Sequence, residues 1–285
     1  MLSQSSFETT YDISSKRDII AFRKLVYSYY RNNSRSHLPW RTDYNPYHIF
    51  ISEVMLQQTQ VDRVISKFIE FTALFPDFRT LADSSLEDVL ASWKGLGYNR
   101  RAMALRNAAR MIVETFGSSL PDSPEQLRTL PGIGNATAAS ITAFAFNKPV
   151  VFLETNIRTV LIYHFFRDKQ GIDDSTLMNA AEKVLDIKNP REWYSAMMDY
   201  GTMVKKSIGN ETKKSRSYKK QTAFRGSRRE LRGKILKVLL ANKSCTTKNL
   251  SSLLNNDTES LLPVLSQLVH ENIVRCERGK YLIAE

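Results

Sequence analysis

The sequence is poor in cysteine and has no long apolar run. Its 285 residues include only Cys245 and Cys276, which cannot build a disulfide framework or a four-thiolate metal site. No stretch of about 18 or more uncharged apolar residues occurs, so no transmembrane helix is expected. The N-terminal residues lack the charged-then-apolar pattern of a signal peptide, and we therefore expect an intracellular protein.

Strand-like alternation is also absent through residue 200, where apolar residues instead recur at helical spacing, as in 16–30, 61–75 and 98–116. The sequence therefore predicts a mainly α-helical protein. Beyond residue 230, three short helical patterns precede two strand-like runs about the turn Arg278-Gly279. This order is similar to a small winged helix-turn-helix, a shape that commonly binds DNA.

The positive charge is concentrated in the C-terminal third. The chain carries a net charge of +12, and residues 201–285 hold 18 Lys and Arg against 7 Asp and Glu, a balance of +11. The densest part, 205–229, has few large apolar residues, which predicts a basic linker. A local positive field of this kind indicates a polyanionic partner, with nucleic acid favoured over a membrane.

The chain is organised around residues 127–158, where Leu130-Pro131-Gly132-Ile133-Gly134 precedes a run of small residues that begins at Asn135. We expect both glycines to adopt conformations that other residues avoid. A tight turn that leads into a helix N-terminus points several backbone N–H groups in one direction, and these groups suit a phosphate. The alternative is an ordinary turn between two helices of an α-protein.

Two carboxylates have surroundings that suit acid chemistry. Glu53 lies among apolar residues of a predicted helix, and an apolar setting raises the pKa of a carboxyl group so that it can donate a proton near neutral pH. Glu154 follows the apolar run 150–153. The alternatives are a glutamate on a solvated helix face for Glu53 and a turn-capping glutamate for Glu154.

The strings SEVMLQQTQV (52–61), GLGYNRRA (95–102) and LPGIG (130–134), followed by a carboxylate before Asn156, resemble the helix-hairpin-helix DNA glycosylases. Among these enzymes the chain is most similar to the MutY-type adenine glycosylases, from about Leu38 to about Met203. The resemblance implies two helical subdomains with the active-site cleft between them. It also implies Glu53 as the general acid and Glu154 as the group that stabilises the charge on the sugar.

The resemblance extends to residues that touch DNA and the extruded base. Trp40, Arg41 and Asn156 match positions of the substrate pocket. The alternative for Trp40 is a core aromatic residue. The residues that match or are expected at the DNA contact are Gln57, Gln58, Thr59, Leu96, Tyr98, Leu130, Gly132 and Gly134, together with Lys213, Lys214, Arg216, Lys219 and Lys220 of the basic segment. Flipping a nucleotide costs a few kcal/mol, which an inserted side chain such as Tyr98 partly offsets.

Four departures from the family pattern affect the expected chemistry. Glu154 stands where the family usually has aspartate, and a displacement of about an ångström can cost roughly a hundredfold in rate. Ala136 replaces the lysine nucleophile of relatives that also cut the backbone. The four-cysteine loop after Met203 is missing, so no iron–sulfur cluster or other metal is expected apart from a monovalent cation at the hairpin. The β-rich domain with which full-length adenine glycosylases sense 8-oxoguanine is not expected either, because the winged-helix-like unit follows in its place.

We therefore expect a helix-hairpin-helix glycosylase fold with a C-terminal winged helix-turn-helix. The predicted domains are a six-helix barrel subdomain with the hairpin (31–142), a second helical subdomain (1–30 and 143–204), the basic linker (205–229) and the winged-helix-like domain (230–285). The expected partner is mispaired double-stranded DNA, and no membrane contact is expected. We expect a monomer that is cytoplasmic and nucleoid-associated. Protein partners are not predicted.

The predicted function is base excision repair by a monofunctional glycosylase that removes adenine mispaired with 8-oxoguanine or guanine. One alternative is excision of mispaired thymine or uracil on the same scaffold, although a pyrimidine offers no equivalent nitrogen for Glu53 to protonate. The other alternative is a non-catalytic DNA-binding protein that uses the C-terminal domain, which the glutamate at position 154 favours.

Overall fold

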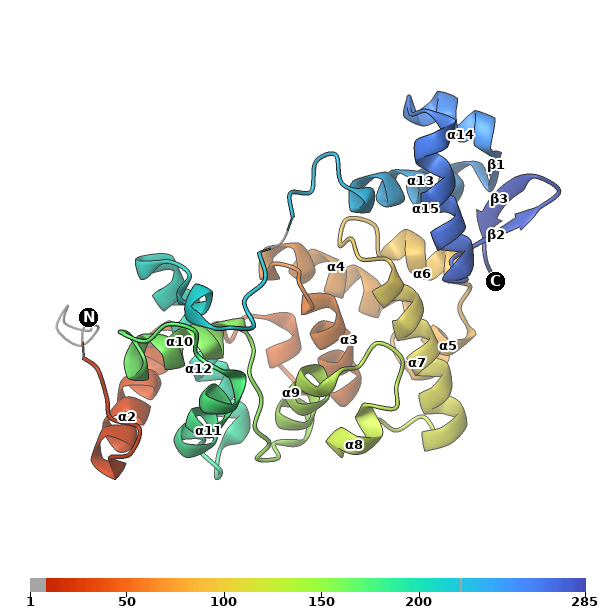
Figure 1. Cartoon of the computed structure of the whole chain (residues 1–285). Coiled ribbons are helices and arrows are strands. Elements are labelled where there is room, and N and C mark those ends of the chain that lie inside the picture. The colour runs from red at the N-terminus through yellow and green to blue at the C-terminus, as the bar shows by residue number, and fades with distance from the viewer. Residues whose placement is uncertain (1–8, 221) are drawn as a thin grey trace. The chain divides into compact units, whose positions relative to one another are not determined.

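The computed structural model describes residues 9–220 and 222–285. The first eight residues of the predicted second helical subdomain, which also begin the stretch read for a signal peptide, lie outside the described residues, as does position 221 of the predicted linker. The described chain is mainly helical, as the sequence predicts, with one small antiparallel sheet near its C-terminus (Figure 1). None of the described helices combines the length and apolar character needed to cross a bilayer.

The described residues form two compact units. The described residues of the first unit are 9–49, 122–125 and 134–220, and those of the second are 50–121, 126–133 and 222–285. The domain boundaries given above stay a prediction. Helix α3 (Pro46–Leu56) and helix α8 (Pro124–Leu127) each contribute residues to both units.

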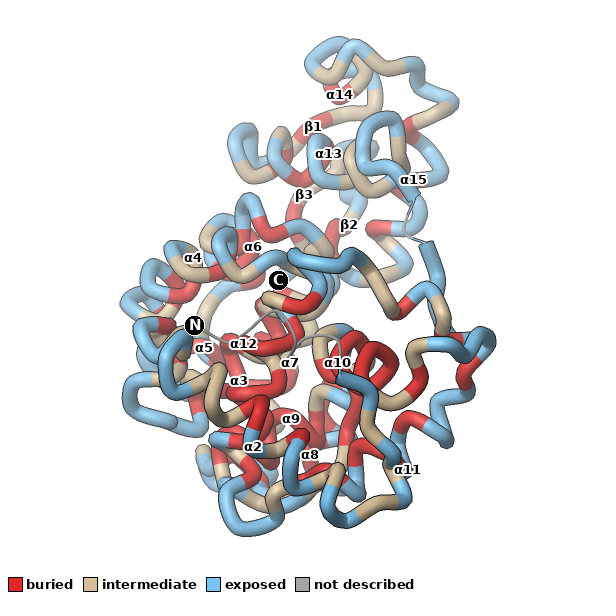
Figure 2. The backbone as a smooth tube through the Cα atoms, turned by 90° about the vertical axis from the view of Figure 1, so that its left-hand side faces the viewer, coloured by how far each residue is buried: buried red, intermediate tan, exposed pale blue. Residues whose placement is uncertain are grey.

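The first unit packs helices around α12 (Pro190–Ile208), which contacts α2, α9 and α10. Figure 2 shows buried residues concentrated along α10 and α12. Buried aromatic side chains such as Phe22, Trp193 and Tyr200 fill this core. The remaining elements of the unit are α2 (Lys16–Asn33), η1 (Pro39–Arg41), α9 (Asn135–Phe146), α10 (Thr155–Phe165), α11 (Asp174–Val184) and η2 (Glu211–Lys214).

The second unit begins with most of α3 and continues through a group of amphipathic helices. Side-chain caps start two of these helices, because Asp77 accepts the Thr80 N–H and Ser85 accepts the Asp88 N–H. Gly117 ends the longest helix in the left-handed conformation. These helices are α4 (Val61–Leu74), α5 (Phe78–Asp83), α6 (Leu86–Ser92) and α7 (Arg100–Phe116).

The C-terminal module, residues 228–285, belongs to the second unit and combines three helices with a three-stranded sheet. Its elements are α13 (Arg228–Asn242), β1 (Ser244–Thr246), α14 (Thr247–Leu254), α15 (Thr258–His270), β2 (Val274–Glu277) and β3 (Lys280–Ile283). The two strands expected about Arg278-Gly279 are present. Strand β1 was not predicted, and it pairs with β3 so that the order is β1-β3-β2.

The predicted linker is partly ordered. Helix α12 continues to Ile208, and η2 follows after a turn at Gly209. Lys214 donates to the Arg167 carbonyl and Arg216 pairs with Asp173, and these two contacts tie the segment to the rest of the first unit. Residues 205–216 therefore differ from an extended segment, and the linker bounds 205–229 stay a prediction.

Candidate active site

Glu154 begins helix α10 and holds it by its own side chain. Its Oε1 accepts hydrogen bonds from the backbone N–H groups of Asn156 at 2.7 Å and Ile157 at 2.9 Å, and its Oε2 accepts one from Asn156 Nδ2 at 3.3 Å. These bonds satisfy N–H groups that have no partner within the helix. Glu154 thus caps α10, as the alternative of a turn-capping glutamate predicts, and its carboxylate has a fixed position beside Asn156.

The protonation of Glu154 reflects two opposing effects. Burial raises the pKa of its carboxyl group above the usual range, while the two backbone N–H groups and the charges of Lys205 and Arg35 act to lower it. A carboxylate whose charge is only partly compensated gains most from a nearby positive charge. The Glu154 carboxylate is therefore suited to stabilise a cation that forms beside it.

Gly201 on α12 allows the start of α10 to come close, and sequence reasoning missed its role. A Cβ atom at position 201 would lie 2.6 Å from the Asn156 carbonyl oxygen and 2.7 Å from the Asn156 Cβ. Both distances are shorter than any normal contact, so the backbone must stay bare at this point. A glycine inside a predicted helix was the available signal, because such a residue costs stability unless packing requires it.

A second residue missed from the sequence, Asp199, organises the polar cluster of the first unit. Its carboxylate receives Arg41 through two hydrogen bonds of 2.8 and 3.1 Å, and Arg35 through both the backbone N–H and Nε. Although burial raises the pKa of Asp199, the hydrogen bonds and charges of Arg41 and Arg35 together outweigh this effect and hold the pKa below its usual value. The cluster fixes Arg41, whereas the neighbouring Trp40 is a buried aromatic residue.

Glu53 lies near the C-terminal end of α3 in the second unit. Its neighbours Ser52, Val54 and Met55 are buried, whereas Glu53 itself is half-buried. The side chain thus leaves the apolar side of the helix and keeps some contact with solvent. This placement agrees with a carboxyl group that is held by an apolar helix and remains accessible to a ligand.

The segment after α3 is held by Arg101, another residue that the sequence did not single out. Its Nη1 donates to the carbonyl oxygens of Val54, Met55 and Gln57 at 2.9, 2.9 and 2.5 Å, and its Nη2 donates to Thr59 Oγ1 at 2.9 Å. Burial lowers the pKa of Arg101 to about 10. The only signal in the sequence was a pair of arginines at the start of a helix.

Tyr98 lies in the loop between α6 and α7 with a positive φ of 50°. The Arg101 guanidinium carbon is 5.3 Å from the centre of the Tyr98 ring, within the range of a cation–π contact. Leu96, which we expected at the DNA contact, is only 4% exposed. Gln58 is exposed and also has a positive φ, of 55°, whereas Tyr98 is half-buried.

The hairpin differs from expectation at one glycine. Gly132 has a φ of +78°, and a Cβ there would lie 2.8 Å from the Ala104 Cβ, so glycine is required. Gly134 has a φ of −89° and ψ of 176°, which any residue adopts. The expectation of a backbone conformation that other residues avoid is therefore wrong for Gly134. The buried Leu130 anchors the turn, and Gln57 Nε2 donates to the Gly132 carbonyl at 3.3 Å.

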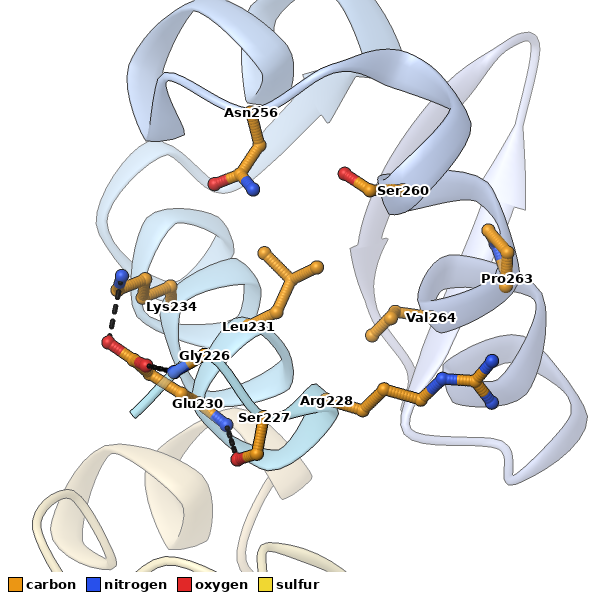
Figure 3. Close-up of a pocket in the computed structure, with 10 residues that line it drawn as sticks. All are labelled: Gly226, Ser227, Arg228, Glu230, Leu231, Lys234, Asn256, Ser260, Pro263 and Val264. Carbon is orange, nitrogen blue, oxygen red and sulfur yellow. Dashed lines mark hydrogen bonds and ion pairs between the residues drawn. The ribbon is translucent and has the colours of Figure 1, made fainter. Parts of the chain in front are cut away.

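A cavity of about 380 Å³ lies elsewhere, in the C-terminal module and the turn before it. It opens between the start of α13 and the start of α15, as Figure 3 shows. Its walls include Ser227, Leu231, Ser260 and Val264. None of the residues predicted for catalysis or DNA contact lines it.

The side chains that could bind a metal ion are scattered over the described chain. Within residues 9–220 and 222–285, no three His, Cys, Asp or Glu side chains come together as a metal ion would require. The two cysteines lie on strands β1 and β2, on either side of Tyr281 in β3. Two thiols cannot hold a four-cysteine cluster, so the residues present do not fit an iron–sulfur group.

Part of the chain matches a known protein family. Residues 51–186 match the family model of the HhH-GPD superfamily base excision DNA repair protein. An adenine DNA glycosylase of Buchnera aphidicola (subsp. Baizongia pistaciae) is 35% identical over 186 residues, which cover 65% of this chain and 53% of the relative. The mouse adenine DNA glycosylase is 35% identical over 217 residues, covering 71% of this chain and 42% of the relative.

Solved structures show the same fold at lower identity. A thermostable thymine-DNA glycosylase has a TM-score of 0.59 and 22% identity, with 69% of this chain and 91% of that chain covered. A trapped endonuclease III–DNA covalent intermediate has a TM-score of 0.53 and 18% identity, with coverages of 66% and 84%. The chain spans about half the length of these curated relatives. Residues 51–186 are thus similar to the HhH-GPD superfamily of base excision DNA repair proteins.

Proposed function

We propose that the chain is a monofunctional DNA glycosylase that hydrolyses the N-glycosidic bond of adenine mispaired with 8-oxoguanine or guanine in double-stranded DNA. The observation that carries the proposal is the Glu154 carboxylate, held by two backbone N–H groups at the start of α10 beside Asn156. Support comes from the adenine DNA glycosylases that resemble residues of this chain at 33–40% identity.

In the proposed reaction, Glu53 and Glu154 take different roles. Protonated Glu53 transfers its proton to a ring nitrogen of adenine, and the bond between the base and the sugar C1′ then breaks with its electron pair leaving on the base. The sugar becomes an oxocarbenium ion, which the Glu154 carboxylate stabilises. Water adds to C1′ and releases a proton to a carboxylate, so the products are adenine and an abasic site. Two carboxyl groups of different pKa divide the same work in glycoside hydrolysis.

Ala136 bears on whether the protein could also cut the DNA backbone. It lies in the first turn of α9 and is exposed, and its methyl group cannot form a Schiff base with the sugar. We therefore propose that the product is an intact strand with an abasic site. We also propose that this takes place without an iron–sulfur cluster.

DNA contact is proposed for three places. The hairpin Leu130–Gly134 would bind a phosphate through backbone N–H groups. Gln57, Gln58, Thr59 and Tyr98 would enter the duplex next to the extruded base, and the exposed lysines of 213–220 would contact phosphates. A monovalent cation at the hairpin stays a proposal, and the Leu130 and Gly132 carbonyl oxygens each keep a second lone pair for it.

A strand-scission assay tests the proposal. Duplexes with A opposite 8-oxoguanine, A opposite G, T opposite G and U opposite G are incubated with the protein and then split into samples with and without alkali. Cleavage of the adenine strand that appears only after alkali is the expected result. Cleavage without alkali would contradict monofunctional action, product from T or U opposite G would assign another target base, and retention of duplex without product would leave only DNA binding.

A further inference from the structure

Arg229 of the C-terminal module contacts Tyr98 in the loop between α6 and α7. Arg229, in the first turn of α13, donates from Nη1 to Tyr98 Oη at 2.7 Å, and its guanidinium carbon lies 5.8 Å from the centre of the Tyr98 ring. The two residues are 131 positions apart in the chain and belong to the same compact unit. A hydrogen bond from a charged donor at this distance is among the stronger ones in proteins.

Hydrogen bonds fix the start of α13, where Arg229 lies. Ser227 caps the helix by accepting the Glu230 N–H, and the Glu230 carboxylate accepts the Gly226 N–H at 2.7 Å and pairs with Lys234 at 2.9 Å (Figure 3). Arg229 Nη2 also donates to the Thr222 carbonyl at 2.6 Å. The guanidinium therefore has a defined direction before any DNA is bound.

Two further ion pairs hold the module against α6 and α7, which flank the Tyr98 loop. Lys243 at the end of α13 pairs with Glu87 on α6. Glu271, whose side chain is 6% exposed, binds Arg232 of α13 and lies 3.8 Å from Arg100 of α7. The contact of Arg229 with Tyr98 is thus one of several between the C-terminal module and the segment from α6 to α7. The module does not have to move for Arg229 to reach Tyr98.

Tyr98 is consequently flanked by two guanidinium groups, that of Arg101 at 5.3 Å and that of Arg229 at 5.8 Å from the ring centre. A tyrosine on an exposed loop would otherwise sample several rotamers and lose that freedom when it enters the base stack. Arg101 belongs to the helix that follows the loop, whereas Arg229 is supplied by the C-terminal module.

We propose that Arg229 is a positioning residue for Tyr98. It fixes the direction in which the tyrosine ring enters the DNA stack, so that the C-terminal module takes part in opening the mispair. This inference rests on the proposed function, because it assigns Tyr98 to the duplex. The module thereby contributes to excision through one hydrogen bond to the loop, separately from any phosphate it contacts.

A double-mutant cycle tests this inference. Arg229→Ala removes the donor, and Tyr98→Phe removes the acceptor while keeping the ring. Single-turnover excision is measured on the duplex with A opposite 8-oxoguanine, together with the fluorescence of 2-aminopurine placed beside the mispair, which reports unstacking without requiring product. Each single variant is expected to lose roughly tenfold in rate and to show weaker unstacking, since one charge-assisted hydrogen bond is removed. The double variant is expected to be no slower than either single variant.

Lys237→Ala is the matched control, because Lys237 is exposed two turns further along α13. It should keep the rate and the fluorescence change of the parent. Losses that multiply in the double variant would overturn the inference, as would an Arg229→Ala effect confined to salt-dependent binding, which indicates a phosphate contact. Faster excision by Arg229→Ala would overturn it too, since the contact would then restrain Tyr98. A parent protein that forms no product from any duplex would instead refute the proposed function.

Discussion

Arg41 and Asp199 form a two-point pair inside the first unit, with Arg41 Nη1 2.8 Å from Asp199 Oδ2 and Arg41 Nη2 3.1 Å from Asp199 Oδ1. The Asp199 side chain is 1% exposed and the Arg41 side chain 9%. Arg35 binds the same carboxylate. Because Arg41 matches a pocket position of the family, the pair connects the core of α12 to a residue expected to touch the extruded base.

Replacement of Asp199 by asparagine should destabilise the protein by about 3 kcal/mol, because removing one partner of a buried pair leaves a buried charge uncompensated. Urea unfolding measures the change. Asp173→Asn is the control, since its pair with Arg216 joins side chains that are 50% and 69% exposed and should contribute at most about 1 kcal/mol. Equal losses for the two variants would show that burial of the Asp199 pair has no special effect.

The sequence pointed to Glu154 as a candidate site residue but not to Asp199, and the physical reason lies in their surroundings. Glu154 follows an apolar run and precedes a helix start, so it stood out in the sequence as a lone carboxylate. Asp199 lies in the middle of α12, and its partners Arg35 and Arg41 are about 160 positions earlier. An acidic residue on a helix is normally a solvated one, and no local pattern reveals a distant partner.

Local sequence pattern also decided which parts of the fold could be predicted. Helices with a regular apolar spacing and the β2–β3 hairpin were found from local pattern. Strand β1 was missed because Ser244–Thr246 is only three residues long and gains its identity by pairing with β3. Arg101 and Arg229 likewise look ordinary in the sequence, because their hydrogen bonds are made to loops that only the folded chain brings near them.

Glu53→Gln should abolish excision and leave the affinity for mispaired DNA nearly unchanged. Glutamine has the shape of the protonated glutamic acid but cannot give a proton to the departing base. Single-turnover kinetics and a binding titration on the duplex with A opposite 8-oxoguanine measure the two effects. A parallel loss of affinity and rate would mean that Glu53 supports the structure of α3 instead of supplying the acid.

The pH dependence of excision should carry the signature of Glu154. Burial raises the pKa of this carboxyl group above its ordinary 4.5, and only the ionised form stabilises the cation. The rate should therefore rise with pH through a midpoint above 4.5. Glu154→Gln should lose this limb and at least about a hundredfold in rate. A midpoint below 4.5 would contradict the assignment.

The basic segment should divide into two classes of lysine. Lys213, Lys219 and Lys220 are exposed, whereas Lys214 binds Glu211 and the Arg167 carbonyl. Replacing the three exposed lysines by alanine should reduce the slope of log affinity against log salt by about 0.9 for each phosphate that the variant no longer neutralises. Lys214→Ala should leave the slope nearly unchanged. An unaltered slope in the triple variant would exclude these lysines from the DNA contact.

Gly201→Ala should disturb the site through packing alone. The new Cβ would lie 2.6 Å from the Asn156 carbonyl oxygen, so the start of α10, which Glu154 caps, must move away from α12. We expect a loss of about 1–3 kcal/mol in unfolding free energy, as overpacking typically costs, and slower excision with it. Urea unfolding and single-turnover kinetics measure the two effects.

Gly233→Ala is the matched control for this change, because a Cβ at position 233 on α13 meets no atom within 4 Å. Alanine there should stabilise the helix by about 0.5–1 kcal/mol and leave excision unchanged. The opposite signs of the two substitutions separate the close contact of α12 with α10 from the general preference of helices for alanine. If Gly201→Ala were as stable and as active as the parent, the approach of α12 would not position Glu154, and the fixed carboxylate would depend on its own hydrogen bonds alone.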